Sequence, residues 1–540
     1  MPQHRPLAAH VLLAGLTGLL YPLCFPNFDL GFLAWVALLP LHLVLATATL
    51  RRAFWLGWLA GLIAFVGVVS WVVTAMHLYG KVPFVISTAL MVLLAAYLGL
   101  YVGLYALGAA WLQRAMPRLS LLGAPFLWVA LEWFRTYLFS GLPWDLLGYS
   151  QYQWLTAIQI ADHTGVYGVS FVVVLVNVAL ADTVLWVLNR SRRPSEGTRV
   201  APFPWLTPAA AILSISVTLL YGQSQLNAVS NAPDRSLTIG LVQANIDQAH
   251  KWDDAYRRET LDRYLRLTAQ AAGGSDLLIW PEAATPFLFE RETEYRGEVT
   301  DLVRTHGVPL LLGSPALRYY PNGRPYLLNS AYFLAPDGEV LGRYDKQHLV
   351  PFGEYIPLKS SLLFFLDKLV EGIGDFEAGT TATVLSVPTK SGASPAPNPA
   401  RFGVVICYEV IFPDLVREFA RGGAGFMVTI TNDAWFGASA APFQHFGMVV
   451  FRAVENRRAF ARAANTGISG FIGPQGHILQ ATPIFEERAV TGSLPVETTL
   501  TVYSRYGDVF AYACVIITGL LFWGARLRMR NEAAGAPNRA

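Results

Sequence analysis

The sequence has few cysteines, few charged residues and no marked excess of charge of either sign. Its three cysteines, Cys24, Cys407 and Cys514, are too few and too scattered along 540 residues for a disulfide framework. No cysteine and histidine spacing resembles a zinc site, so we expect no metal. The formal net charge is only +3, and the basic residues form no stripe along the sequence. No nucleic-acid-binding motif is present. The sequence therefore excludes disulfide-rich scaffolds and predicts no nucleic-acid partner.

The scarcity of charge excludes an ordinary soluble enzyme. Charged residues make up 14% of the chain and hydrophobic residues 54%, with a mean hydropathy of +0.40. A membrane-crossing helix needs about 20 apolar residues, and no cleavage site follows the first run that is long enough, so we expect that run to be retained. We predict about eight transmembrane helices, at 8–25, 30–50, 53–76, 83–112, 119–139, 164–189, 206–222 and 509–528.

Arginines mark alternate ends of these runs. Arg51, Arg114, Arg190 and Arg526 follow the second, fourth, sixth and eighth runs. Because short cytoplasmic loops are enriched in Lys and Arg, both termini are expected in the cytoplasm and the region between the last two runs outside. The expected domains are 1–225, a membrane domain with seven helices; 235–500, an extracytoplasmic domain; and 505–530, a final transmembrane helix.

The region between the last two runs alternates short apolar segments with helical patterns. This alternation over some 260 residues predicts one large layered α/β domain. We expect helices at about 256–272, 291–306 and 413–421, and strands at 237–245, 276–280, 308–313, 326–334, 402–407, 425–431, 460–466 and 470–473. The Pro- and Ser-rich stretch 391–400 is expected to be a loop.

The candidate reactive group lies at the end of one of these strands. The apolar, β-branched run 404–406 ends on Cys407, which Tyr408 and Glu409 follow. Catalytic groups gather beyond the carboxyl ends of strands in layered α/β domains. Taken alone, Cys407 is better explained as a small buried apolar residue, and only the other motifs of the chain favour a reactive group.

Two further charged residues end or interrupt similar strand patterns, namely Glu282 and Lys346. A free thiol with a pKa of about 8.5 is mostly protonated near neutrality, so it needs a base or a nearby cation. Glu282 is a candidate base. Lys346 is a candidate cation that lowers the thiol pKa or neutralises an oxyanion, aided by backbone amides near Tyr408. Each of the two alone fits an ordinary surface lysine or strand-end carboxylate, but together with Cys407 they predict thiol acyl chemistry.

The three motifs resemble those of the carbon–nitrogen hydrolase (nitrilase) superfamily. They are Trp-Pro-Glu ending at Glu282, Tyr-Asp-Lys-Gln-His-Leu-Val-Pro-Phe-Gly-Glu containing Lys346 and Glu354, and Ile-Cys-Tyr-Glu containing Cys407. With the flanking membrane segments, the whole chain is similar to the apolipoprotein N-acyltransferase family. The resemblance implies a polytopic α-helical membrane domain plus an α-β-β-α sandwich.

The resemblance also implies a reaction and its setting. A phospholipid, typically phosphatidylethanolamine, would donate an acyl chain to Cys407, and the amino group of a lipoprotein's diacylglyceryl cysteine would accept it. The cycle would need no cofactor. The protein would be a monomer in the bacterial inner membrane, with its catalytic domain in the periplasm.

Further positions match motifs of the family. We expect Trp252 and Trp435 to form an apolar wall for acyl chains, although ordinary core packing explains each of them equally well. Glu354 and Glu409 are expected to position Lys346, and Tyr408 lies in the segment after the nucleophile.

Other residues have more than one interpretation. Arg135, near the outer end of the fifth run, is either a snorkelling anchor or a contact for a lipid phosphate. His348 and His445 suggest a Cys/His dyad, which the resemblance disfavours. The segment 141–154 is either a plain connector or an interfacial element that covers a lipid passage.

Two other functions compete with the acyltransferase. A membrane-tethered amidohydrolase of the same superfamily would pass the acyl group to water. A non-enzymatic assembly or transport protein would use the outer domain only for binding, but the intact set of Glu282, Lys346 and Cys407 argues against it.

Overall fold

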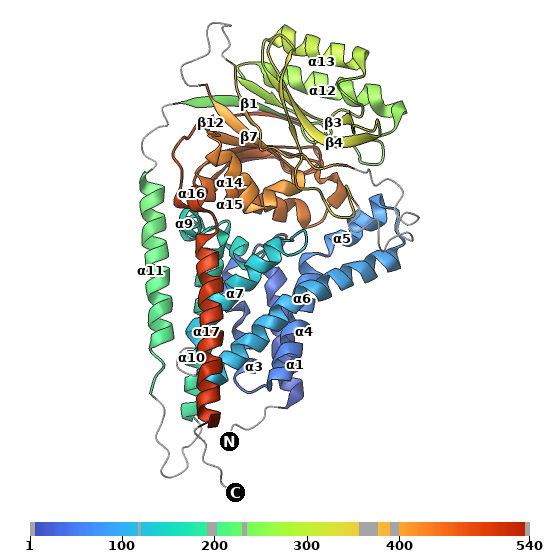
Figure 1. The fold of residues 1–540 in the computed structure, drawn as a ribbon. Coiled ribbons are helices and arrows are strands. Elements are labelled where there is room, and N and C mark those ends of the chain that lie inside the picture. Colours follow the sequence, from blue (N-terminus) through green and yellow to red (C-terminus); the bar gives the residue numbers. More distant parts are fainter. Residues whose placement is uncertain are drawn as a thin grey trace. The chain divides into compact units, whose positions relative to one another are not determined.

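The computed structural model describes residues 6–116, 120–191, 202–228, 235–355, 376–388 and 399–534. Most of the loop predicted at 391–400 therefore lies outside the described residues. The chain forms two compact units (Figure 1). The first, here called the membrane unit, comprises Met1–Ser70, Thr88–Asn227 and Asp508–Ala540; the second, here called the catalytic unit, comprises Trp71–Ser87 and Ala228–Gly507.

The membrane unit is built of helices. Among the described residues, five helices are long and apolar enough to cross a membrane. They are α4 (Leu50–Val68), α6 (Phe84–Ala115), α10 (Val166–Ser191), α11 (Leu206–Asn227) and α17 (Val509–Ala534). Two further helices, α1 (Leu7–Leu23) and α7 (Ser120–Tyr137), occupy other predicted runs. The polytopic membrane domain is thus confirmed, whereas the number of eight crossings stays a prediction.

The second predicted run, 30–50, is not one continuous helix. It consists of η1 (Gly31–Leu33), α2 (Ala34–Ala37) and α3 (Leu39–Leu45). The side chain of Asn177 stabilises the break, because its Oδ1 accepts the backbone N–H groups of Leu38 and Leu39 at 2.9 and 3.1 Å. Pro40, which has no N–H to donate, lies in the first turn of α3. Composition alone hides this interruption, because all three pieces are apolar.

The third predicted run, 53–76, also ends early. Helix α4 stops at Val68, and α5 (Trp71–Thr74) and a π-helical turn η2 (Ala75–Tyr79) follow it within the catalytic unit.

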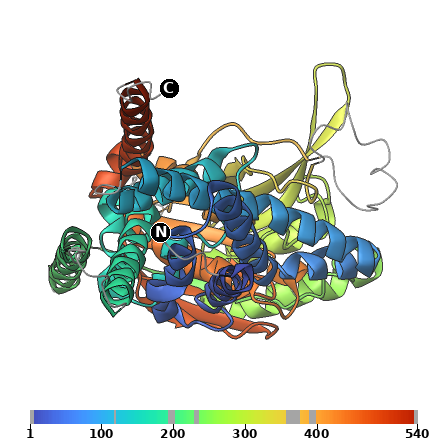
Figure 2. The ribbon, with the colours of Figure 1, turned by 90° about the horizontal axis from the view of Figure 1, so that it is seen from below.

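Neighbouring helices of the membrane unit approach closely. Helix α1 packs on α4, and α10 packs on α7 and α11 (Figures 1 and 2). A Cβ atom added to Gly61 of α4 would lie 2.8 Å from the Cα of Gly99 of α6. Small residues at such contacts let two backbones pack together, as is typical of helices in lipid.

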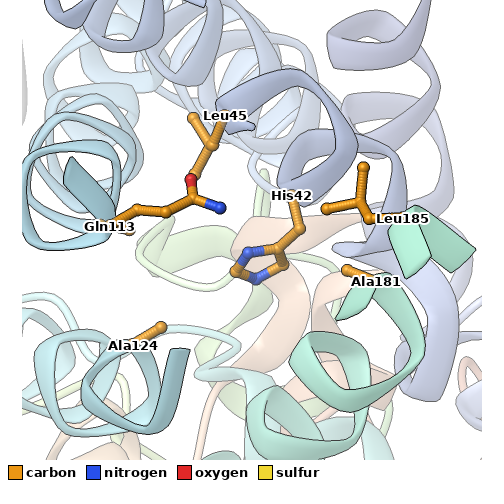
Figure 3. A pocket seen from close by; sticks show the side chains of 7 residues that line it. His42, Leu45, Gln113, Ala124, Ala181 and Leu185 are labelled. Atoms are coloured by element: carbon orange, nitrogen blue, oxygen red, sulfur yellow. The ribbon is translucent and has the colours of Figure 1, made fainter. Parts of the chain in front are cut away.

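A small pocket lies inside this unit, around the ring of His42 (Figure 3). The Nε2 atom of His42 is 3.0 Å from the hydroxyl of Tyr105. None of the predicted site residues lines the pocket, so it is not part of the candidate site. The lining residues are His42, Leu45, Ala109, Gln113, Ala124, Ala181 and Leu185.

The catalytic unit contains two six-stranded sheets. The first has the order β12 (Arg488–Pro495), β1 (Ser236–Gln243), β2 (Leu277–Ile279), β3 (Leu310–Tyr319), β4 (Pro325–Leu334), β5 (Val340–Asp345). The second has the order β11 (Ile478–Ala481), β10 (Gly470–Ile472), β9 (Ala459–Ala464), β8 (Phe426–Thr431), β7 (Arg401–Ile406), β6 (Val384–Ser386).

Helices cover the outer face of each sheet (Figure 1). Helices α12 (Arg257–Ala272) and α13 (Thr293–His306) lie on the first sheet, and α14 (Pro413–Arg421) and α15 (Ala441–Asn456) lie on the second. The rings of Phe333 and Phe402 join the two sheets, with their centroids 5.3 Å apart. The predicted α-β-β-α sandwich is therefore confirmed.

Parallel pairing brings polar residues together at one edge of each sheet. Strands β7, β8 and β9 run parallel, as do β1, β2 and β3. Their carboxyl ends lead into Cys407 after β7, Asn432 after β8, Asn465 after β9 and Glu282 after β2. Such edges are where α/β domains place reactive groups.

Candidate active site

Cys407 begins a short 3₁₀ turn, η6 (Cys407–Ile411), directly after β7. Its φ of 52° lies in the left-handed region, which is rare for residues other than glycine and is frequent at functional sites. The carboxylate of Glu409 stabilises the turn by accepting the N–H of Ile406 at 2.7 Å. Cys407 is only 9% exposed. The sequence thus places a constrained, buried thiol at the edge of the second sheet.

The carboxylate of Glu282 is held on both oxygens. Its Oε1 accepts the Asn329 side-chain N–H at 2.7 Å and lies 3.5 Å from the Lys346 ammonium nitrogen. Its Oε2 accepts the backbone N–H of Asn432 at 2.9 Å. These contacts come from β4, from the segment after β5 and from the end of β8, so both sheets position this carboxylate.

Lys346 is buried between two carboxylates. Its Nζ lies 2.9 Å from Oε1 of Glu354, and the residue is 1% exposed. Burial alone would lower the pKa of Lys346, but the charges of Glu354 and Glu282 outweigh burial and raise it above its usual value. The side chain is therefore an ammonium group throughout the neutral range, as oxyanion stabilisation requires.

The two further glutamates named by the sequence have different contacts. Glu354 touches Lys346 directly, and its second oxygen accepts the N–H of Val350 at 2.8 Å. Glu409 makes no hydrogen bond to the ammonium; it accepts the backbone N–H of Gln347 at 2.7 Å and the Tyr344 hydroxyl at 2.8 Å. Glu409 therefore orders the backbone directly after Lys346 and the side chain of Tyr344 before it, and it does not contact the ammonium group.

The surroundings of Cys407 keep its thiol protonated. Burial raises the pKa of Cys407, the negative charge of Glu282 raises it further, and Lys346 opposes both only in part. A neutral thiol is a weak nucleophile, so it needs a base at the moment of attack. Glu282 is the carboxylate with the largest effect on this pKa.

Lys251 is a second ammonium group at the site, which sequence reasoning missed. Its Nζ donates to the backbone carbonyl of Glu282 at 3.2 Å, and it is 2% exposed. Burial lowers the pKa of Lys251 to about 8, while Glu282 and Cys407 partly oppose the shift. In the sequence, the one feature that could have pointed to Lys251 is its position next to Trp252. Asn329 and Asn432 were also missed, because amides carry no distinctive pattern.

The two predicted tryptophans are exposed aromatic residues of the catalytic unit. Trp252 is 51% exposed and Trp435 is 40% exposed. The ring of Trp435 meets that of Tyr79 edge-on, at 5.8 Å between centroids. Neither is core packing, and exposed aromatic surface suits contact with an apolar ligand.

Three further predicted residues, Tyr408, His348 and Arg135, have contacts of other kinds. The Tyr408 ring packs edge-on against Phe412 at 5.1 Å, and the His348 ring stacks on the same phenylalanine at 3.7 Å. Arg135 belongs to the membrane unit, where it is 3% exposed and lies 5.0 Å above the Phe65 ring. Its proposed lipid contact stays a prediction.

Comparison with known proteins agrees with this architecture. Residues 17–179 match the apolipoprotein N-acyltransferase N-terminal domain, and residues 238–502 match the carbon–nitrogen hydrolase family. An apolipoprotein N-acyltransferase of Geobacter metallireducens is 44% identical over 509 residues, covering 93% of each chain. One of Chlorobaculum tepidum is 33% identical over 550 residues, covering 97% of this chain and 98% of its own.

Among solved structures, an amidase of Nesterenkonia from the nitrilase superfamily is similar to 52% of this chain and 96% of its own, with 21% identity and a TM-score of 0.36. The two family models and the apolar helices define a polytopic membrane protein with a carbon–nitrogen hydrolase domain. The chain belongs to the apolipoprotein N-acyltransferase family and is an acyltransferase.

Proposed function

We propose that this enzyme transfers an acyl chain from a membrane phospholipid to the N-terminal amino group of a lipoprotein's diacylglyceryl cysteine, through a thioester on Cys407. The observation that carries the proposal is the position of Glu282. Its carboxylate is held by Lys346, Asn329 and Asn432, and its charge acts on the buried thiol. A base, a cation and a thiol in this arrangement support acyl transfer.

In the first half of the cycle, Cys407 attacks the ester carbonyl of the phospholipid. Glu282 takes the thiol proton as the sulfur–carbon bond forms. Lys346 and backbone amides near Tyr408 stabilise the oxyanion of the tetrahedral intermediate. When the intermediate collapses, the ester carbon–oxygen bond breaks, and the leaving lysophospholipid oxygen receives the proton from Glu282.

In the second half, the amine of the lipoprotein attacks the thioester carbonyl. Glu282 takes a proton from the amine and returns it to the departing sulfur of Cys407, so the free thiol is restored. The products are an amide on the lipoprotein and the resting enzyme. The two half-reactions follow one another at one site, which is a ping-pong cycle.

Both proposed substrates are lipids, which explains why the catalytic unit is joined to a membrane unit. We infer that the donor and acceptor reach the site from the bilayer, and that Trp252 and Trp435 contact their acyl chains. The positions of the arginines support cytoplasmic termini and a catalytic domain on the other side of the membrane. Because the relatives are bacterial proteins, we propose a bacterial inner-membrane location with the catalytic domain in the periplasm. We propose that the enzyme works as a monomer.

Intact-protein mass spectrometry tests the thioester. The detergent-solubilised wild type and the Cys407→Ala variant are incubated with phosphatidylethanolamine and then treated with neutral hydroxylamine. We expect only the wild type to gain one acyl mass and to lose it with hydroxylamine. Equal gain in both proteins, or gain in neither, would refute the mechanism. Adding a diacylglyceryl lipopeptide then separates acyl transfer from hydrolysis, because an amidohydrolase would release free fatty acid.

A further inference from the structure

Three buried polar side chains form a chain of contacts that leads to the backbone of Cys407, and the proposed cycle does not use them. Asp433 follows β8, His445 lies on α15, and Arg462 lies on β9. Asp433 is 1%, His445 1% and Arg462 0% exposed. Burial of three such groups is costly unless each is paired, so their contacts need an explanation.

The three side chains form a connected network. The Arg462 guanidinium donates to Oδ2 of Asp433 at 2.7 Å, and Thr431 donates to Oδ1 of Asp433 at 2.8 Å. The Nδ1 atom of His445 lies 3.1 Å from the same guanidinium and 3.2 Å from Oδ1 of Asp433. Burial of Asp433 would raise its pKa, but the charge of Arg462 and the hydrogen bond from Thr431 hold it well below its usual value. Asp433 is therefore a carboxylate.

The other end of the imidazole contacts the nucleophile. The Nε2 atom of His445 lies 3.1 Å from the backbone carbonyl oxygen of Cys407. A carbonyl oxygen only accepts hydrogen bonds, so Nε2 carries the proton. Burial and the charge of Arg462 lower the pKa of His445, so the ring is neutral and its Nδ1 accepts from Arg462. Nε2 thus contacts a backbone atom of Cys407.

We propose that His445, held by Arg462, which Asp433 positions in turn, is a positioning residue that fixes the peptide carbonyl of Cys407 and thereby the orientation of the nucleophile. This inference rests on the proposed thioester chemistry and adds a residue to it. The left-handed φ of 52° at Cys407 is an unfavourable conformation that the surroundings must maintain. Because a peptide unit is planar, fixing the carbonyl also fixes the direction of the following N–H, that of Tyr408.

The segment 431–433, which contains Asp433, also positions the base, Glu282. Asn432, next to Asp433 in the chain, donates its backbone N–H to Oε2 of Glu282 at 2.9 Å. The segment 431–433 therefore contacts Glu282 directly and Cys407 through His445. A shift of this segment would change the distance between base and nucleophile, on which proton transfer depends.

The test is the single-turnover acylation of Cys407 by phosphatidylethanolamine, followed by rapid quenching and mass spectrometry. His445→Leu removes the donor, and His445→Gln retains an N–H that can reach the carbonyl. The acylation amplitude measures the fraction of the protein that is active, whereas the rate constant depends on the geometry of the active site. His306→Leu, in an exposed position of the same unit, is the matched control.

We expect His445→Leu to lower the rate constant about 10- to 100-fold, the size typical of misplacing a reacting group by up to an ångström. The phospholipid concentration for half-maximal rate should not change, and His445→Gln should recover most of the loss. Asp433→Asn should also slow the step, and the double variant should be no slower than His445→Leu. An unchanged rate constant, or a fall in amplitude alone, overturns the inference.

A second readout separates this inference from the proposed function. Iodoacetamide alkylation of Cys407, followed by peptide mapping, needs no phospholipid. We expect alkylation at neutral pH to be several-fold slower in His445→Leu than in the wild type, because Glu282 then removes the thiol proton less effectively. If the wild type forms no thioester, the proposed function fails, and equal alkylation rates then refute the positioning role independently.

Discussion

Among the single residues of the site, Lys251 gives the clearest pH dependence. Because burial lowers its pKa to about 8, its positive charge is present below that pH and lost above it. This charge lies near Glu282 and Cys407, where acylation builds up negative charge. We expect the wild-type rate of thioester formation to fall as the pH rises through about 8.

The variant Lys251→Met should be slower already at neutral pH and should not show this decline. Single-turnover acylation measured across the neutral and alkaline range checks both statements. Lys81→Met, which removes an exposed lysine of the same unit, should keep the wild-type profile. A decline near pH 8 that persists in Lys251→Met would assign it to another group.

Glu409 gives a prediction for stability. Its two oxygens accept from four groups: the N–H of Ile406, the N–H of Gln347, the N–H of His348 and the Tyr344 hydroxyl. Glu409→Gln would turn one acceptor into an N–H donor that faces another donor. We expect a loss of about 1–3 kcal/mol, the usual cost of an unpaired buried polar group.

Hydrogen exchange of the amides in 406–409 checks this, because the lost stability should appear as faster exchange in that turn. Glu339→Gln, at an exposed position, is the control. Unchanged exchange in Glu409→Gln would mean that the backbone of the nucleophile turn does not depend on this carboxylate.

At the level of elements, strand β3 passes close to the turn that carries Glu282. A Cβ atom at Gly313 would lie 2.5 Å from the Pro281 carbonyl oxygen and 2.7 Å from the Glu282 Cα. These are backbone atoms, so Gly313→Ala must displace the turn. We expect a fall of about 100-fold in the acylation rate constant, with the fold retained.

Gly297→Ala on α13 is the matched control, because an added Cβ meets nothing within 4 Å there. It should leave the rate unchanged. Wild-type acylation in Gly313→Ala would show that the Glu282 turn can move without cost, contrary to the tight packing between β2 and β3.

The sequence predicted those elements whose pattern is local. The strand leading to Cys407 was expected at 402–407 and is found at Arg401–Ile406, and the helix expected at 413–421 is Pro413–Arg421. Helix α15 was missed because all of its residues from Ala441 to Asn456 are buried apart from Phe443, so it shows no polar face.

Long-range contacts limited the prediction of the site. Motifs identified Glu282, Lys346 and Glu354, which the structure brings together, although their catalytic roles stay predictions. No pattern encodes the contact of His445 with a carbonyl 38 positions away, since any residue offers the same acceptor. The contacts of Glu409 could not be predicted for the same reason, because its partners are mostly backbone N–H groups, while its role in positioning Lys346 stays a prediction.

At the scale of the whole molecule, the positions of the arginines predict its orientation in the membrane. Arginines follow alternate apolar runs, so the proposed topology places the catalytic unit outside and the C-terminal end of α17 inside. Both regions offer exposed positions for labelling, Arg304 on α13 and Arg528 on α17, whereas the three native cysteines are buried.

We expect a membrane-impermeant maleimide to label Arg304→Cys in intact spheroplasts and to label Arg528→Cys only after lysis. The reason is that a polar reagent reaches only the outer face of a sealed bilayer. The wild type serves as the background control for the buried thiols. The opposite pattern would place the catalytic unit in the cytoplasm, and labelling of both positions before lysis would show that the membrane was not sealed. Acyl transfer needs the amino group of the lipoprotein on the side of the membrane where the catalytic unit lies. This result therefore also decides on which side the acceptor must be supplied.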